Sequence, residues 1–250
     1  MPAEKRPAPT PAPPLDAPLD ELLDWANAAY GVAFEPLSID DVRLEVLQIA
    51  DMQAHIEHLA AAATGQGVEL PLWSRVWPAS LITSHFLRRL PPAPGRPMLE
   101  IGAGLGVCGL FAAAFGHEAL ITDVNPDALR FARINVLHNG LEDRITVARA
   151  NFAGDVLPRR FLRIVGSEIL YLEPLFVPLL TFLRTHLAAE PEAEAILSCN
   201  YIRDHQSFLD LASRDFAVQT ATIGCKSAQR EGEETQRHLI NIHRLKVRHA

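Results

Sequence analysis

From Arg96 to the end of the chain, short apolar runs alternate with longer segments in which apolar residues have helical spacing. This alternation predicts a parallel sheet covered by helices on both faces, the architecture of α/β proteins. The expected strands lie near residues 97–102, 118–123, 144–150, 162–167, 194–200, 215–223 and 237–246, and the expected helices near 106–115, 126–138, 173–187 and 204–213.

The last two expected strands are joined by a loop rich in glycine and glutamate, Gly224 to Glu234, with no helix between them. A connection of this kind joins neighbouring antiparallel strands, because a parallel pair needs a longer crossover. The pattern therefore predicts a doubly wound, mostly parallel sheet of seven strands whose last strand is antiparallel.

The beginning of the chain has a different composition. Residues 1–18 contain seven prolines and almost no apolar bulk, so we expect a disordered tail. Helical spacing follows over Leu19 to Tyr30, and Val42 to Ile49 alternates as a strand does. We expect residues 19–69 to form an extension packed on one catalytic domain, residues 70–250.

Composition narrows the class of partner and the compartment. A hydrophobic content of 48% in 250 residues is enough for one substantial core, and the formal net charge of −7 argues against nucleic acid as a partner. The three cysteines, Cys108, Cys199 and Cys225, are odd in number and far apart, so neither disulfides nor a zinc site is expected. We find no candidate membrane span, metal site or signal peptide, and we expect a cytoplasmic protein.

The most informative motif is the segment from Met98 to Gly109, MLEIGAGLGVCG, which ITDVNP follows at 121–126. It has the pattern strand, glycine turn, helix, strand, acidic end. Glycines at 102, 104 and 106 allow a sharp turn and a close approach of backbone to ligand, and the next helix offers unpaired N–H groups. Asp123, at the tip of the second strand, is placed to accept the hydroxyls of a ribose. These features predict an adenosine-type cofactor.

Two kinds of cofactor fit this motif. Gly104, Gly106 and Gly109 satisfy the dinucleotide spacing G-x-G-x-x-G, which is weak evidence alone. However, Glu100 interrupts the first strand, and the chain lacks the substrate domain of a dehydrogenase. The pattern Glu-x-Gly-x-Gly-x-Gly formed by Glu100, Gly102, Gly104 and Gly106 resembles the first motif of the seven-strand (class I) methyltransferases. That resemblance implies S-adenosylmethionine as cofactor.

Residues from about Leu70 to Leu245 resemble a narrower group, the small non-histone protein lysine methyltransferases. In LWSRVWPA at 72–79, the resemblance implies that Trp77 borders the cofactor, and Arg75 is a candidate partner for the cofactor carboxylate. Asn151 and Phe152 stand where the family has an acidic residue and an aromatic residue around the adenine. Amide and phenyl groups still offer a hydrogen bond and a stacking surface.

The segment GSEILY at 166–171 resembles the family's acid-x-x-aromatic motif. The resemblance implies that Glu168 faces the sulfonium and the incoming amine, that Tyr171 walls the same pocket and that Ser167 lies among the cofactor contacts. Methyltransferases of nucleic-acid amines have a Pro-Pro motif at this position, which is absent here. Tyr201, after the next strand, is open to two interpretations, a contact with substrate or a packed loop residue.

These observations predict an S-adenosylmethionine-dependent N-methyltransferase that methylates a lysine side chain of a cytoplasmic protein by direct displacement. Two alternatives remain open at this point. The acceptor would be a small amine or metabolite in the first, and in the second the protein would bind the cofactor without turnover and act through partner proteins.

Overall fold

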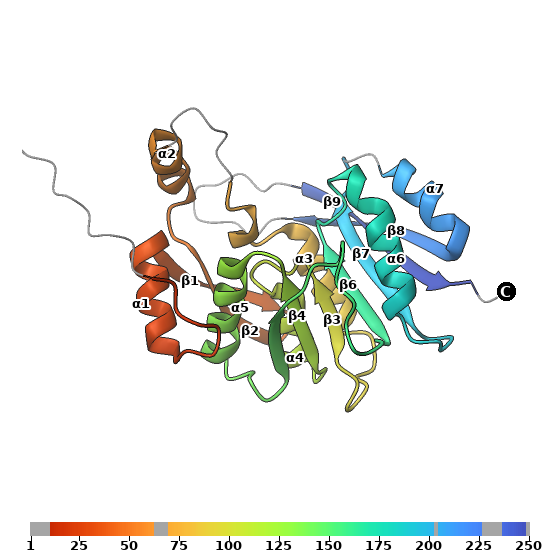
Figure 1. The fold of residues 1–250 in the computed structure, drawn as a ribbon, viewed down its shortest axis with the longest axis horizontal. Coiled ribbons are helices and arrows are strands. Elements are labelled where there is room, and N and C mark those ends of the chain that lie inside the picture. Colours follow the sequence, from red (N-terminus) through yellow and green to blue (C-terminus); the bar gives the residue numbers. More distant parts are fainter. Residues whose placement is uncertain (1–10, 63–69, 203–204, 227–236, 249–250) are drawn as a thin grey trace, which may run out of the picture.

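The computed structural model describes residues 11–62, 70–202, 205–226 and 237–248. Its centre is a seven-stranded sheet in the order β5-β4-β3-β6-β7-β9-β8 (Figure 1). Neighbours from β5 to β7 are parallel, and β9 is antiparallel to both β7 and β8, so the predicted sheet is confirmed. The strands are β3 (Met98–Ile101), β4 (Ala119–Asp123), β5 (Ile145–Arg149), β6 (Arg163–Ser167), β7 (Glu194–Asn200), β8 (Phe216–Lys226) and β9 (Arg237–Val247).

Helices cover both faces of this sheet. One face carries α3 (Pro78–Leu87), α4 (Val107–Ala114) and α5 (Pro126–His138), and the other carries α6 (Phe176–His186) and α7 (Gln206–Asp215). Side chains alternate along β3 as the pleat requires: Leu99 and Ile101 enter the core under α6, and Met98 enters the core under α4. Two short 3-10 helices, η1 (Leu72–Ser74) and η2 (Glu173–Leu175), precede α3 and α6.

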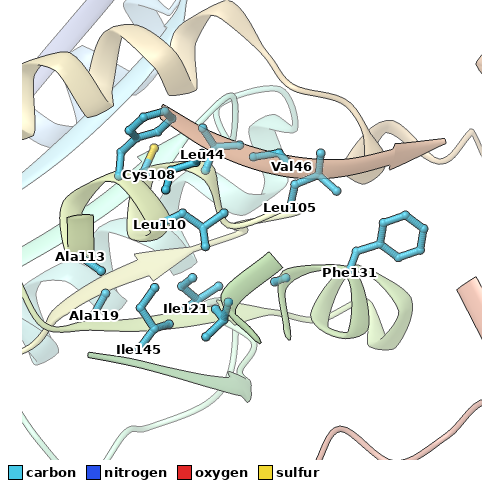
Figure 2. Packing of buried hydrophobic residues seen from close by; sticks show 14 of the residues in the cluster. Leu44, Val46, Leu105, Cys108, Leu110, Ala113, Ala119, Ile121, Phe131 and Ile145 are labelled. Atoms are coloured by element: carbon cyan, nitrogen blue, oxygen red, sulfur yellow. The ribbon is translucent and has the colours of Figure 1, made fainter. Parts of the chain in front are cut away.

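The extension before the sheet consists of α1 (Leu19–Tyr30), β1 (Val32–Ile39), β2 (Val42–Ile49) and α2 (Met52–Ala62). The strands β1 and β2 form an antiparallel hairpin beside α4 and α5 (Figure 1). Figure 2 shows Leu44 and Val46 of β2 lying over Leu105 and Leu110, and all four residues are buried in the same core. The extension is therefore joined to the domain of the seven-stranded sheet by a shared hydrophobic core.

Hydrogen bonds from α5 fix the position of this hairpin. The Leu47 N–H donates to Asn135 Oδ1 at 2.7 Å, and the Glu45 N–H donates to Asn139 Oδ1 at 3.0 Å. Asn139 Nδ2 donates in return to the Glu45 carbonyl at 2.8 Å. Because the two asparagines are four residues apart on one face of α5, they satisfy part of the free edge of β2.

Residues 11–18 differ from the tail that we expected. Pro13 and Ala17 are buried, and Arg130 Nε of α5 donates to the Pro13 carbonyl at 2.7 Å. The rest of the expected tail, residues 1–10, lies outside the described residues, and the boundaries at 19 and 70 stay predictions. None of the helices within the described ranges has the length and apolar character needed to cross a bilayer.

Candidate functional site

The turn between β3 and α4 is built from glycines in the left-handed conformation. Gly102, Gly104 and Gly106 have φ angles of 57°, 55° and 77°. A Cβ on Gly104 would lie 2.6 Å from the carbonyl oxygen of Trp73, a backbone atom that cannot move independently. A side chain is therefore excluded at Gly104 both by the conformation and by the space. The backbone of η1 forms a cover over this turn.

Glu100 lies behind the glycine turn, where we expected a cofactor contact. Its side chain is buried, with 2% of the residue exposed, and its carboxylate accepts the N–H groups of Cys108 at 3.2 Å and Gly109 at 2.7 Å. Burial raises the pKa of Glu100 to about 7, and the two donated hydrogen bonds oppose that rise. The carboxylate thus satisfies the N-terminal N–H groups of α4 and positions the turn from below.

Asp123 ends β4 beside the same turn and is only 8% exposed. Its carboxylate accepts the Gly104 N–H on Oδ2 and the Asn125 N–H on Oδ1, each at 2.9 Å. A carboxylate has about four acceptor positions, so two of them are left for further donors such as ribose hydroxyls. The expected neighbourhood of Asp123 and the glycine turn is present in the structure.

The segment after β6 brings two further candidates to this edge of the sheet. Ser167 ends β6, and its Oγ is buried without a hydrogen-bond partner in the described part of the chain. Glu168 has a φ of 56°, a left-handed conformation that is uncommon for a residue with a side chain, and its N–H donates to the Ser198 carbonyl at 2.8 Å. The next residue, Ile169, packs against Gly102: its Cγ2 lies 2.8 Å from the place that a Cβ on Gly102 would occupy. This contact joins the segment after β6 to the glycine turn.

The remaining expected residues also lie at strand ends or helix starts along this edge. Trp77 precedes α3, its Nε1 donates to the Leu72 carbonyl at 3.1 Å, and the exposed Arg75 guanidinium lies 5.2 Å from its ring centroid. Asn151 and Phe152 follow β5, and Asn151 Oδ1 accepts the Ala153 N–H at 2.9 Å. Tyr171 is 57% exposed, so among the described residues its side chain does not form the wall of a closed pocket.

Two residues at this edge had no role in the sequence interpretation. Trp73 supplies the backbone that covers Gly104, and its ring packs on Phe131 at 5.0 Å and on Tyr30 at 5.6 Å between centroids. Ser198 receives the Glu168 N–H on its carbonyl and the Thr83 hydroxyl on its Oγ. Neither contact leaves a local signal, because both join segments far apart in the sequence. Among the residues that the structure describes, no group of three or more His, Cys, Asp or Glu side chains is arranged to hold a metal ion.

Two solved structures with a similar fold are named methyltransferases. A putative RNA methyltransferase from Pyrococcus horikoshii superposes with a TM-score of 0.56 and 14% identity, over 78% of this chain and 99% of that one. A precorrin-6y C5,15-methyltransferase from Geobacter metallireducens gives a TM-score of 0.55 and 16% identity, over 74% and 92%. At these identities, the similarity establishes the Rossmann-like methyltransferase fold.

Sequence relatives define the family. Residues 64–215 match the family described as lysine methyltransferase. The protein N-lysine methyltransferase METTL21A of Danio rerio is 34% identical over 153 residues, which cover 58% of this chain and 68% of that protein. The EEF1A lysine methyltransferase 3 of Mus musculus is 33% identical over 165 residues, covering 60% and 70%. The chain belongs to the lysine methyltransferase family, and its cofactor is S-adenosylmethionine.

The residues at the carboxyl edge of the sheet fit this cofactor. Asp123 has acceptor positions left for hydroxyls, and Ser167 has a buried hydroxyl without a partner among the described residues. A buried hydroxyl without a partner costs free energy, and a polar group of a ligand would remove that cost.

Proposed function

We propose that this protein transfers a methyl group from S-adenosylmethionine to the side-chain amine of a lysine in a cytoplasmic partner protein. The family and the printed names of the relatives, protein N-lysine methyltransferase and EEF1A lysine methyltransferase, support a protein lysine as acceptor. Cys108 and Cys199 are buried and are not joined in a disulfide, which is compatible with a reducing compartment.

The observation that carries the proposal is the conformation of Glu168. A left-handed residue with a side chain costs about 1–2 kcal/mol and persists where the surroundings impose it, which occurs mainly at functional sites. The Ser198 hydrogen bond and the buried Ile169 on either side impose it here. We assign Glu168 to the acceptor side of the reaction and Ser167, the preceding residue, to the cofactor side.

The bound cofactor supplies a methyl group activated by a positive sulfur. The neutral amine of the acceptor lysine would take this methyl group by direct displacement, with a C–N bond forming as the S–C bond breaks and S-adenosylhomocysteine leaving. A lysine of ordinary pKa, near 10.4, is neutral in only about one molecule in 2,500 at pH 7, a deficit of roughly 4.6 kcal/mol. Glu168 would orient the ammonium and hold it until its proton passes to water, after which the neutral amine is in place to react.

In the proposed site, Asp123 would accept the ribose hydroxyls, and the glycine turn would receive the amino-acid end of the cofactor, with Arg75 beside its carboxylate. Asn151 and Phe152 would flank the adenine, and Trp77 would border the cofactor near α3. Tyr171 would contact the acceptor from the exposed side of Glu168. All of these residues lie in the segments along the carboxyl edge of the sheet, where ligands bind in folds of this kind.

A labelling experiment tests the function. Lysate from cells that lack the enzyme is incubated with the purified protein and tritiated S-adenosylmethionine, and labelled proteins are digested and sequenced by mass spectrometry. We expect a lysine to gain one or more methyl groups. A labelled free amine with no labelled protein would establish the small-molecule alternative, and no transfer at all despite cofactor binding would establish the non-catalytic one.

The Glu168→Gln variant tests the assigned role. We expect it to lower the transfer rate by about 100-fold, because the ammonium loses the group that orients it, while affinity for S-adenosylhomocysteine changes by less than about threefold. Glu192→Gln is the matched control, since Glu192 is exposed before β7, at the opposite edge of the sheet. Equal losses of rate and affinity in Glu168→Gln would place this residue in the cofactor site instead.

A further inference from the structure

Large apolar side chains are exposed around the edge of the sheet where Glu168 lies. They come from η1, from the segments after β6 and β7 and from β9, and their exposed fractions range from 45% at Leu172 to 88% at Ile202. We call this set the apolar collar, and it consists of Leu72, Tyr171, Leu172, Tyr201, Ile202 and Leu239.

Hydrogen bonds hold the segments of the collar together around Ser198. The Glu168 N–H donates to the Ser198 carbonyl, three residues before Tyr201, and the Tyr201 N–H donates to the Leu239 carbonyl at 2.9 Å. On the other side, Ser198 Oγ is hydrogen-bonded to Thr83 of α3 at 2.6 Å. The same helix begins after Trp77, which is bonded to the carbonyl of Leu72. The segments that carry the collar are therefore linked by hydrogen bonds to one another and to Glu168, the residue assigned to the acceptor.

The segment after β6 has its apolar residues divided between two environments. Ile169 and Leu170 are buried and anchor the segment in the core, whereas Tyr171 and Leu172, which follow at once, are exposed. Exposed apolar groups that gather at one place mark an interaction surface more often than single ones do. Here they gather beside a carboxylate in a strained conformation.

The charges beside the part of the collar after β6 indicate what this part binds. Glu168 precedes Tyr171 and Leu172, and the exposed Glu173 follows them, whereas the exposed cations Arg75 and Arg237 lie near Leu72 and Leu239 in other parts of the collar. A ligand that matches this arrangement carries a positive group with apolar groups next to it. A lysine between apolar side chains in an extended segment has that chemistry, whereas a lysine among polar residues would leave the collar in contact with water.

We propose that the apolar collar binds an extended segment of the partner protein in which apolar side chains flank the acceptor lysine. This inference rests on the proposed function and adds a rule for choosing among lysines. Covering one leucine or isoleucine side chain of the partner would raise the affinity by about tenfold.

Two synthetic decapeptides test the rule. Each has one lysine and the same net charge, with leucine and phenylalanine beside the lysine in the first and serine and asparagine in the second. We expect the enzyme, with S-adenosylmethionine, to methylate the first peptide with a kcat/KM at least about tenfold higher, mainly through a lower KM. The double variant Tyr201→Ser, Ile202→Ser should reduce this preference to less than about threefold. Val156→Ser, which changes an exposed apolar residue outside the collar, should keep it.

The outcomes separate this inference from the proposed function. Equal methylation of the two peptides by the wild-type enzyme, or a preference that survives the double variant, would overturn the collar and leave lysine methylation intact. Labelled lysines in the lysate with neither peptide methylated would also overturn it, because the proposal requires an extended segment. If neither the lysate nor the peptides are labelled, the proposed function itself fails. Binding of S-adenosylhomocysteine, measured by calorimetry, should be the same in all variants.

Discussion

At the scale of residues, two buried carboxylates at the ends of neighbouring strands have different tasks. Asp123 accepts N–H groups from the loops that follow β3 and β4 and keeps acceptor positions toward the cofactor edge. Glu100 is enclosed and accepts N–H groups from the first turn of α4. From the sequence we expected both to contact the cofactor, whereas in the structure the buried Glu100 carboxylate lies behind the glycine turn and accepts N–H groups of the following helix.

The raised pKa of Glu100 predicts a pH dependence of stability. In the unfolded chain this group titrates near 4.5, and in the folded chain near 7, because burial disfavours its charge. The folded state therefore holds the proton more tightly, and the stabilisation is complete below pH 4.5 and is lost as the pH rises to about 7. For the wild type, we expect this group alone to lower the free energy of unfolding by about 3 kcal/mol between those limits.

Urea unfolding of wild type and Glu100→Gln at pH 5, 6, 7 and 8 measures this contribution. The wild type should lose stability relative to the variant as the pH rises, because glutamine does not titrate. The difference between the two proteins also cancels the contribution of other titrating groups, such as His243, whose pKa is lowered to about 4 by burial. Glu142→Gln, at an exposed position, should run parallel to wild type. Parallel curves for Glu100→Gln and wild type would show that Glu100 titrates alike in both states.

At the scale of elements, the sheet could be predicted because each strand and helix after Arg96 has its own period of apolar residues. The strand β1 was missed because Pro36 interrupts its pattern; Pro36 is tolerated there because the hairpin has only two strands and open edges.

The candidate site was predictable where a motif is local, as in the glycine turn. The cover formed by Trp73 and the exposure of Tyr171 depend on contacts between distant segments, which no local pattern encodes.

The contacts of residues 11–18 predict that two truncations differ. Removal of residues 1–10 should leave the melting temperature within about 1 °C, because a proline-rich segment has little apolar surface to contribute. Removal of residues 1–18 also takes away the buried Pro13 and Ala17 and the acceptor of Arg130, and should lower the melting temperature by roughly 2–8 °C. Scanning calorimetry of both truncated proteins makes the comparison. Two equal melting temperatures would mean that these contacts contribute nothing to stability.

At the scale of the whole molecule, the extension and the methyltransferase sheet share both a core and the cofactor edge. Trp25 and Tyr30 of α1, Trp73 of η1 and Phe131 of α5 form one aromatic cluster, with ring centroids 5.0–6.2 Å apart. The Tyr30 hydroxyl also donates to Asp127 Oδ2 at 2.5 Å, in the first turn of the helix that follows Asp123. Because the Trp73 carbonyl covers Gly104, this cluster determines how η1 lies over the glycine turn.

This connection predicts that losing the contact between η1 and the extension weakens cofactor binding. In Trp73→Ala, η1 loses its contacts with Tyr30 and Phe131, so the cover over Gly104 is no longer held, and affinity for S-adenosylhomocysteine should fall by about tenfold. Trp73→Phe keeps an aromatic ring and should restore most of the affinity.

Leu245→Ala is the control, because Leu245 is buried in the core on the opposite face of the sheet and its loss lowers stability without reaching the cofactor edge. Calorimetric titration at a temperature where all variants are folded decides the question. If Trp73→Ala binds as tightly as wild type, or Leu245→Ala loses affinity equally, the aromatic contacts that join η1 to the extension have no specific part in holding the cofactor.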